Sequence, residues 1–442
     1  MDTPMTEESS LLPVTKPSSN PYSTALAYSG KLGNGLMALQ VGLVLVFLFA
    51  TTYPDADDYS PAEYYIWKDI MAMLLIGFGF LMTFLKQYGL GAVGFTMLLT
   101  VMSMQLNIVI ELIMRVIYGF ITSTEMKDTS FPMPIGMSTI IDSQFSAATL
   151  LISFGAIIGR ASPYQMLVMT VSQSFFYAFN KVFIVFGILA AEDVGGTMTI
   201  HMFGAYFGLA ASMAMGASPP EKGSPEADKV SDLFAMIGTT VLWIFWPSFV
   251  GATETGTAVN EMRCTTNTII SLMASTGVSF WASQKLCKGK FDPVHIANST
   301  LAGGVAIGST ARLNMGPGVA AVIGMMSGIV SVYGYVYSSP ALEEVGIFDT
   351  CGVGNLHGLP SLIGGLASVA IVAMDPTAEF LNHNAYLQPF MQLLGVILTV
   401  VISATSGYAT GVFMKSPTVV PSKNDSPVVY EDEVYWHAEY FE

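Results

Sequence analysis

The sequence predicts an all-α, polytopic membrane protein with about twelve transmembrane helices. Of its 442 residues, 52% are hydrophobic and only 11% are charged, and the mean hydropathy is +0.56. A soluble domain carries roughly a quarter charged residues, so this composition excludes an ordinary soluble protein. A helix of about 20 apolar residues crosses a bilayer, and the sequence contains twelve candidate runs, at 35–52, 66–86, 90–119, 137–158, 163–190, 197–217, 231–251, 263–284, 294–314, 318–338, 353–374 and 386–413.

The apolar runs define a channel domain at 35–414 between two polar tails. Residues 1–34 are acidic and rich in Ser and Pro, and residues 415–442 are acidic, so we expect both tails to be disordered. An even number of spans places both tails on one side of the membrane. Most of the Lys and Arg residues fall on that same side, which predicts cytoplasmic tails.

Two polar stretches interrupt the apolar pattern in the same way. They read DVGGTMTIHMFGAYF at Asp193–Phe207 and DTCGVGNLHGLP at Asp349–Pro360, and each places a His eight positions after an Asp. The two lie five spans apart, and an odd separation reverses their direction across the membrane. We therefore expect a five-plus-five inverted repeat, at about 66–217 and 231–374, with the functional site between the halves near the membrane midplane.

His201 and His357 are costly inside a membrane unless they have a partner or line a cavity. Eight helical residues rise about 12 Å, close to half the hydrocarbon core, so His201 should lie near the midplane. Two imidazoles can pair, with one ring N–H donating to the bare nitrogen of the other, and we expect both to be neutral. The repeated spacing favours such a pair; the alternative is two separate structural histidines.

Asp193 and Asp349 each have two possible roles. At the mouth of a pore, a carboxylate attracts a cation. At the start of a span, such as the one that begins at Thr197, Asp is a favoured N-cap that binds backbone N–H groups. One carboxylate can do both, and we favour the structural role slightly at each position.

The sequence predicts no enzyme, no metal and no cofactor. An Asp lies about 12 Å along a helix from its His, too far for a catalytic dyad. HExxH, GxSxG and P-loop motifs are absent, and the three cysteines have no metal or disulfide spacing. The net charge of −15 argues against nucleic-acid binding.

Six segments in order across most of residues 66–375 resemble the Rh branch of the ammonium transporter superfamily (Amt/Mep/Rh). They are GFGFLMTFLKQYG (77–89), FSAATLLISFGAIIGRASP (145–163), GGTMTIHMFGAYFGL (195–209), SDLFAMIGTTVLWIFWPSF (231–249), HIANSTLAGGVAIG (295–308) and DTCGVGNLHGLPSLIGG (349–365).

The resemblance implies a homotrimer in which each subunit has its own narrow, hydrophobic pore for ammonia. His201 and His357 match the family's twin pore histidines, and Asp193 matches its acid above the pore. The remaining matches are two stacked phenylalanines that gate the outer mouth, Phe145 and Phe249, and two vestibule acids, Asp232 and Asp349.

Three positions depart from the family pattern. Gln144 stands where relatives carry an acid before the first gate phenylalanine, which weakens a cation trap there. No Trp occurs between Trp67 and Trp243, which favours a low-affinity Rh-type channel over a high-affinity transporter. Residues 53–65 contain no Asn, so the glycan found in the first outer loop of animal relatives is not expected.

The leading hypothesis is a facilitative channel for neutral ammonia, driven by its gradient. A dehydrated cation at mid-membrane costs ~3–17 kcal/mol, on analogy with charged side chains. Carbon dioxide passage and a non-transporting scaffold or sensor are the alternatives, and the presence of both histidines disfavours the scaffold. We expect the plasma membrane, with the vacuole or another endomembrane as alternatives, and the acidic tail could bind a cytoplasmic partner.

Overall fold

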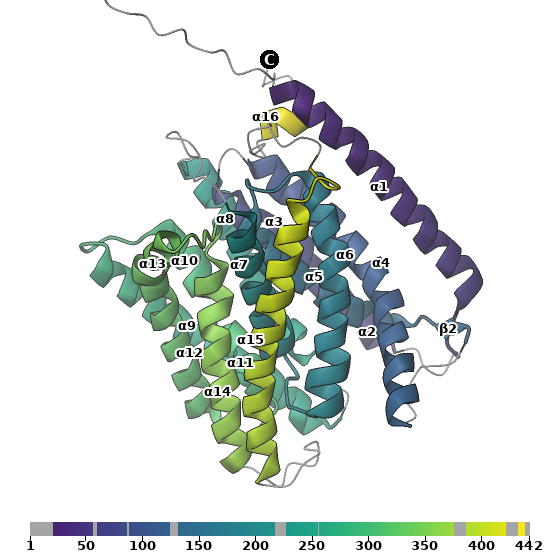
Figure 1. The fold of residues 1–442 in the computed structure, drawn as a ribbon. Coiled ribbons are helices and arrows are strands. Elements are labelled where there is room, and N and C mark those ends of the chain that lie inside the picture. Colours follow the sequence, from purple (N-terminus) through teal and green to yellow (C-terminus); the bar gives the residue numbers. More distant parts are fainter. Residues whose placement is uncertain are drawn as a thin grey trace, which may run out of the picture.

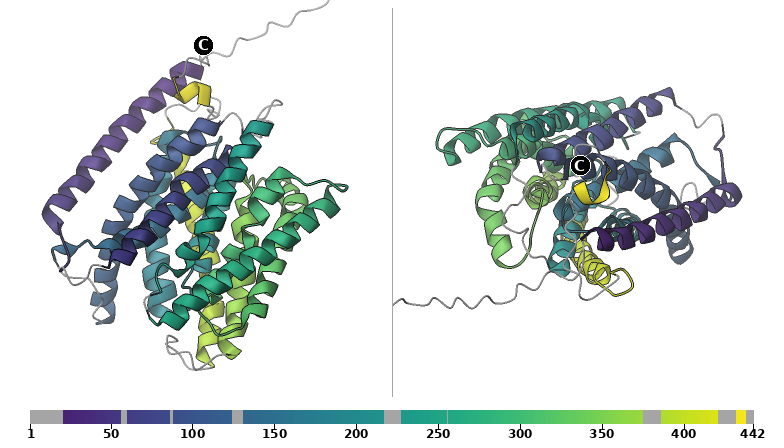
Figure 2. Two further views of the ribbon diagram at one scale, coloured as in Figure 1. Left: turned by 180° about the vertical axis from the view of Figure 1, so that it is seen from behind. Right: turned by 90° about the horizontal axis from the view of Figure 1, so that it is seen from above.

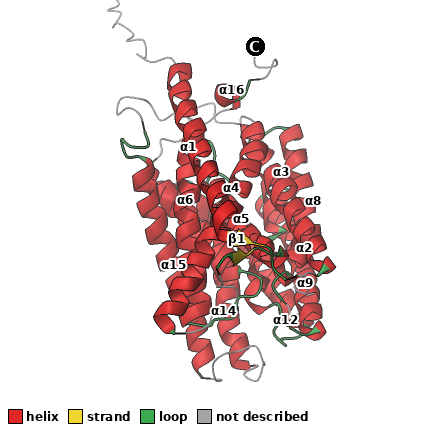
Figure 3. Ribbon diagram, turned by 90° about the vertical axis from the view of Figure 1, so that its right-hand side faces the viewer, coloured by secondary structure: helices red, strands yellow, loops and turns green. Residues whose placement is uncertain are grey.

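The computed structural model describes residues 21–55, 60–85, 88–123, 131–216, 227–254, 256–374, 386–420 and 432–437. These residues form a bundle of helices with two short strands (Figures 1 and 3). We call the end of the bundle that carries helix α16 (Asp432–Tyr435) the tail face. We call the opposite end, which carries the strands, the strand face. Residues 1–20, 421–431 and 438–442 of the predicted tails lie outside the described residues.

The first half of the bundle alternates between the two faces. Its strands, β1 (Thr51–Thr52) and β2 (Met133–Pro134), pair in parallel and connect the end of the first helix to the start of the fifth. Its helices are α1 (Pro21–Ala50), α2 (Pro61–Ala72) continued by η2 (Met73–Phe78), α3 (Gly79–Leu81) and η3 (Met82–Phe84), α4 (Gly89–Thr122), α5 (Met137–Ile157), α6 (Pro163–Phe179) continued by η5 (Asn180–Ile188), and η6 (Thr197–Met202) continued by α7 (Phe203–Met215).

The second half repeats this alternation and ends near the first helix. Its elements are α8 (Lys229–Gly251), α9 (Ala258–Leu286), α10 (Pro293–Ser299), α11 (Ala302–Ile307) with η7 (Gly308–Thr310), α12 (Pro317–Tyr333) with η8 (Gly334–Ser338) and α13 (Ser339–Glu344), η9 (Gly354–Gly358) with α14 (Leu359–Met374), α15 (Leu387–Met414) and α16.

Ten helices in the described ranges are long and apolar enough to cross a membrane. The other two predicted spans do not form such helices, each for its own physical reason. The run at 263–284 lies in α9, which is long enough but carries a polar stripe that includes Ser271, Ser275 and Ser279. The run at 294–314 is divided among α10, α11 and η7, so no single helix covers it.

Small residues bring the helices of the second half into close contact. A Cβ placed on Gly324 of α12 would lie 2.1 Å from the carbonyl oxygen of Ser271 in α9. A Cβ on Gly328, one turn on, would lie 2.7 Å from the carbonyl oxygen of Ser275. Such small-residue stripes let helices approach where lipid provides no hydrophobic driving force.

The first helix begins earlier than the sequence indicates. α1 starts at Pro21, inside the predicted tail, and leans away from the bundle (Figures 1 and 2). Its apolar side chains Leu45, Leu48 and Phe49 are exposed, as expected for a helix that faces lipid.

The short helix α16, in the predicted acidic tail, packs on the tail face against α4. The Asp432 carboxylate accepts hydrogen bonds from the backbone N–H groups of Leu90 (2.6 Å) and Gly91 (2.7 Å). Burial raises the pKa of Asp432, and these two bonds oppose the rise. The N-cap residue of α4, Tyr88, makes no side-chain capping bond, so the distant Asp432 satisfies N–H groups that the helix itself leaves open. Trp436 meets the Phe95 ring edge-on at 5.7 Å.

Candidate functional site

Two short π-helical turns bring His201 and His357 together in the centre of the bundle. His201 lies in η6 and His357 in η9, each at the start of a long helix. Their Nδ1 atoms are 3.1 Å apart, their rings are stacked at 5.2 Å and 10°, and both side chains are buried. The imidazole pair predicted from the repeated spacing is therefore present in the structure.

The histidine pair lies within a column of aromatic rings. Phe145 and Phe249, which the family resemblance implies as stacked gate phenylalanines, meet edge-on at 5.1 Å and 82°. Phe249 in turn lies 5.9 Å from the His201 ring. On the other side of the pair, Phe78 stacks on His357 at 6.2 Å and 20°. The other rings named in this column, Phe78, Phe145 and Phe249, carry no polar atom.

His201 carries an unused polar atom. Its Nε2 is buried and has no hydrogen-bond partner within the described part of the chain. A buried polar group without a partner costs about 1–3 kcal/mol. A small polar solute that reaches this nitrogen would recover part of that free energy, so the position is suited to a transient ligand.

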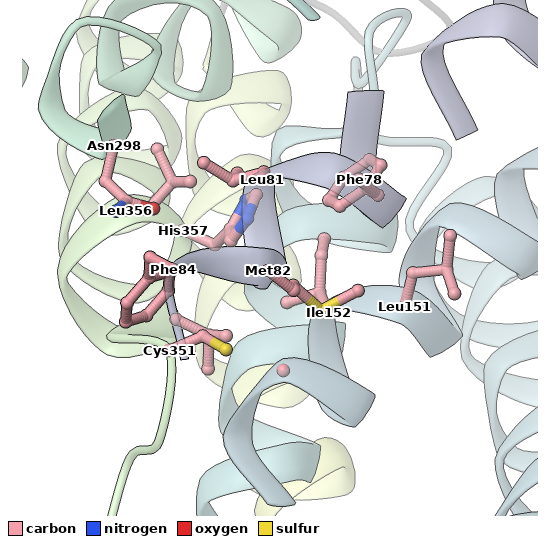
Figure 4. Close-up of a pocket in the computed structure, with 12 residues that line it drawn as sticks. Phe78, Leu81, Met82, Phe84, Leu151, Ile152, Asn298, Cys351, Leu356 and His357 are labelled. Atoms are coloured by element: carbon pink, nitrogen blue, oxygen red, sulfur yellow. The ribbon is translucent and has the colours of Figure 1, made fainter. Parts of the chain in front are cut away.

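A small cavity extends from His357 (Figure 4). Its volume of about 20 Å³ is enough for about one molecule the size of water. The close-up shows residues converging on it from the stretch η2–α3–η3, from α5, from α10 and from the segment Cys351–His357. Its lining is mainly apolar, with Asn298 and His357 among the polar exceptions, and includes Phe78, Leu81, Met82, Phe84, Leu151, Ile152, Cys351 and Leu356.

Asp193 caps the turn that carries His201. Its carboxylate accepts from the N–H groups of Met198 (3.0 Å) and Thr199 (2.8 Å) and from the hydroxyls of Thr199 and Ser309. Burial raises the pKa of Asp193, and these hydrogen bonds oppose the rise. Since only 2% of the residue is exposed, the carboxylate is positioned to hold the backbone rather than to meet bulk solution.

Asp349 caps the turn that carries His357 in the same manner. Its carboxylate accepts from the N–H groups of Val353 (2.8 Å) and Gly354 (2.7 Å). Burial raises the pKa of Asp349 to about 6, against the opposing effects of these bonds and of the Arg160 charge. Burial lowers the pKa of Arg160 itself to about 10.

Two other residues named from the sequence lie away from the histidines. Asp232 is in the first turn of α8 at the tail face, half-buried and in electrostatic contact with Asp228 and Asp292. Gln144, in place of an acid, is buried and donates to the carbonyl oxygen of Trp67 at 3.0 Å.

Sequence reasoning missed three side chains next to the pair. Trp246 stacks on His201 at 5.6 Å and 18°, Phe78 stacks on His357, and Asn298 lines the cavity. Trp246 lies three positions before Phe249 on the same helix face, which is a signal that could have identified it. Phe78 and Asn298 have no comparable signal, because their helices are brought to the site only by the fold.

The fold and the site together define a class: a helical membrane protein with two facing histidines inside an apolar column. The model for the Ammonium Transporter Family matches residues 64–425. Over 423 residues the chain is 41% identical to Ammonium transporter Rh type A of Bos taurus, covering 91% of this chain and 94% of that protein. The chain therefore belongs to the Ammonium Transporter Family, in its Rh branch.

Other relatives agree with this assignment. The chain is 37% identical to Ammonium transporter Rh type B of Papio hamadryas, over 87% of this chain and 84% of that protein. A solved structure of Nitrosomonas europaea Rh50 matches with a TM-score of 0.73 and 33% identity, over 85% of this chain and 91% of that chain. Saccharomyces cerevisiae Mep2, at 15% identity and a TM-score of 0.61 over 81% of this chain and 86% of that chain, shares the fold.

Proposed function

We propose that this protein is a facilitative channel that conducts neutral ammonia past His201 and His357. The observation that carries the proposal is the buried, unpartnered Nε2 of His201 inside a column of aromatic rings. The imidazole pair provides a polar contact without fixed charge, midway along an apolar path. The names of the Rh type A and Rh type B relatives, both ammonium transporters, support ammonia or ammonium as the substrate.

The proposed selectivity follows from desolvation. Ammonium would lose its hydration shell between Phe145 and Phe249, where the rings provide no carboxylate to compensate, at a cost of ~3–17 kcal/mol. Ammonia has no net charge and needs only hydrogen-bond partners. In this proposal the two phenylalanines form the gate, Asp193 holds the His201 turn, and Asp232 and Asp349 act as acids of the tail-face vestibule.

The assembly and orientation are part of the same proposal. The protein is a homotrimer with one pore per subunit, as the family resemblance implies, and it resides in the plasma membrane. Lys285 is in the last turn of α9, and Lys288 and Lys290 lie between α9 and α10 at the tail face. Positive charge in short loops favours the cytoplasmic side, so the tail face is cytoplasmic.

The test is a liposome assay that records internal pH and membrane current together after an ammonium jump. We expect rapid alkalinisation without current in the wild type, and a reduced rate in His201→Ala, which removes the unpartnered nitrogen. His437→Ala changes an exposed histidine of the C-terminal segment and serves as the matched control.

Two outcomes contradict the proposal in different ways. A current that follows ammonium would show net charge transport and overturn neutral conduction. Rates equal to those of empty liposomes would overturn ammonia transport altogether, and the same vesicles would then be tested for carbon dioxide passage through the mainly apolar cavity.

A further inference from the structure

Three side chains with metal-binding donor atoms meet at the tail face, outside the proposed pore. Cys287 follows the last residue of α9, Asp292 precedes the first residue of α10, and His295 lies in the first turn of α10. A thiol sulfur, a carboxylate oxygen and an imidazole nitrogen from these residues lie within 4.8 Å of one another. The Cys287 Sγ to His295 Nδ1 distance is 3.8 Å.

The donor atoms are pre-positioned by the ends of two helices. Asp292 caps α10 through Oδ1, which accepts from the N–H groups of Val294 (2.8 Å) and His295 (3.2 Å). Both of these bonds use one oxygen, so the second oxygen of the carboxylate remains for a ligand. Ser283 links the cluster, because its Oγ accepts from the Asp292 N–H at 3.0 Å and lies 3.2 Å from His295 Nδ1.

We propose that Cys287, Asp292 and His295 bind a divalent transition metal of the zinc class, with water in a fourth position. Zn–S bonds of about 2.3 Å and Zn–N bonds of about 2.0 Å place neighbouring tetrahedral donors about 3.5 Å apart. The sulfur and nitrogen are already near that separation, so a modest contraction completes the site. Thiolate and imidazole donors favour zinc over magnesium or calcium.

The surrounding charges set the expected strength of binding. A thiolate and a carboxylate together balance a divalent cation, and Asp232 adds negative potential through its electrostatic contact with Asp292. Lys288 and Lys290 are exposed in the loop between the two helices, and the N–H groups of Val294 and His295 draw on the charge of the Asp292 carboxylate. These positive groups oppose a cation, so affinity should fall below that of a closed four-ligand structural site.

A metal bound at this position would affect the structure near the cavity. His295 lies one turn before Asn298, which lines the cavity beside His357. A metal bound to Cys287 and His295 would join the end of α9 to the start of α10. Metal occupancy would thereby stiffen the helix end that holds a lining residue of the cavity.

The test uses the full-length protein, purified in detergent without an affinity tag and titrated with Co²⁺. We expect one Co²⁺ per chain, a thiolate-to-cobalt charge-transfer band, and loss of that band when Zn²⁺ is added. Cys287→Ser should abolish the band and weaken binding at least tenfold. Asp292→Asn, which retains a capping side chain, should weaken binding while leaving the band in place.

Cys264→Ser is the matched control, because Cys264 is buried elsewhere on α9. It should leave both band and stoichiometry unchanged. Absence of stoichiometric cobalt binding by folded protein would overturn the proposal, as would a band that survives in Cys287→Ser. Size-exclusion profiles establish that each variant is folded, and the readout does not depend on transport activity.

Discussion

Each of the two histidine-bearing segments is tied to a helix end in the other half of the chain by a backbone hydrogen bond. At the strand face, the N–H of Gly195 donates to the carbonyl of Gly308 at 3.0 Å. At the tail face, the N–H of Cys351 donates to the carbonyl of Gly155 at the same distance. Both donors lie two positions after the motif Asp. We call these two backbone hydrogen bonds, with the segments that they join, the strand-face crossing and the tail-face crossing. Such a reciprocal pair is what an inverted repeat produces.

The two crossings differ in the charges that hold them. Arg312 binds both carboxylate oxygens of Glu192, the residue before Asp193, and donates to Glu254 at 3.1 Å. Arg160 contacts the residue before Asp349 without a carboxylate: it donates to the backbone carbonyl of Phe348 at 3.0 Å and lies over the Phe348 ring at 4.8 Å. The Nε and Nη2 atoms of Arg160 are buried and have no hydrogen-bond partner within the described ranges.

The two crossings share their backbone geometry but differ in the side-chain contacts that stabilise them. The same backbone arrangement positions a histidine on each side of the site. The strand-face segment is held by an ion-pair network, whereas the tail-face segment is held by hydrogen bonds of Arg160 and by its cation–π contact with Phe348. Substitutions that remove charge should therefore affect the strand-face segment more.

The largest difference is expected between Arg312→Gln and Arg160→Gln. The first leaves the buried carboxylates of Glu192 and Glu254 without their cation and should cost about 3–5 kcal/mol of unfolding free energy. The second removes the bonds to Ser212 and Phe348 and should cost about 2 kcal/mol. The midpoint of thermal unfolding in detergent measures both. Equal losses would show that the ion pair contributes nothing beyond its hydrogen bonds.

Gly195 and Cys351 occupy equivalent positions in the two crossings. Exchanging their residue types should have a smaller effect on the free energy of unfolding. A Cβ on Gly195 would lie 2.6 Å from the Cα of Gly308, where backbone cannot yield, so Gly195→Cys should cost about 1–3 kcal/mol. Cys351→Gly removes a side chain that the tail-face crossing accommodates and should cost about 0.5–1 kcal/mol. The same thermal assay compares them. If Gly195→Cys were as stable as the wild type, the strand-face crossing would be looser than the structure indicates.

A third difference is a pH dependence at the tail face, which only a titration reveals. The folded-state pKa of Asp349 is about 6, above its usual 3.8, so the folded state binds the proton more tightly than the unfolded chain. This contribution to stability is present at low pH and is lost as the pH rises through about 6. Asp349→Asn, which is neutral throughout, should flatten the dependence of the unfolding midpoint over this window. Parallel profiles for wild type and variant would contradict the assignment.

The sequence predicts the paired motifs well and their surroundings poorly. Apolar run lengths indicate the helices, and the equal Asp-to-His spacing predicts the His201–His357 pair, because both are local patterns. The edge-on contact of Phe145 with Phe249 and the stacking of Trp246 on His201 depend on helix orientation, which no local pattern encodes. The Glu192–Arg312 pair joins residues far apart in the chain, so spacing cannot identify it.

The docking of α16 has a consequence for the order of assembly during synthesis. The N–H groups of Leu90 and Gly91 have no Asp432 carboxylate to bind until the chain has grown by more than three hundred residues. At about 5–20 residues per second, that interval is roughly 20–70 s. During this interval, the N–H groups at the tail-face end of α4 must be solvated by water or bound by other groups. The first turn of α4 is therefore capped by Asp432 only after both histidines have been made, so this capping is a late step in the maturation of the folded chain.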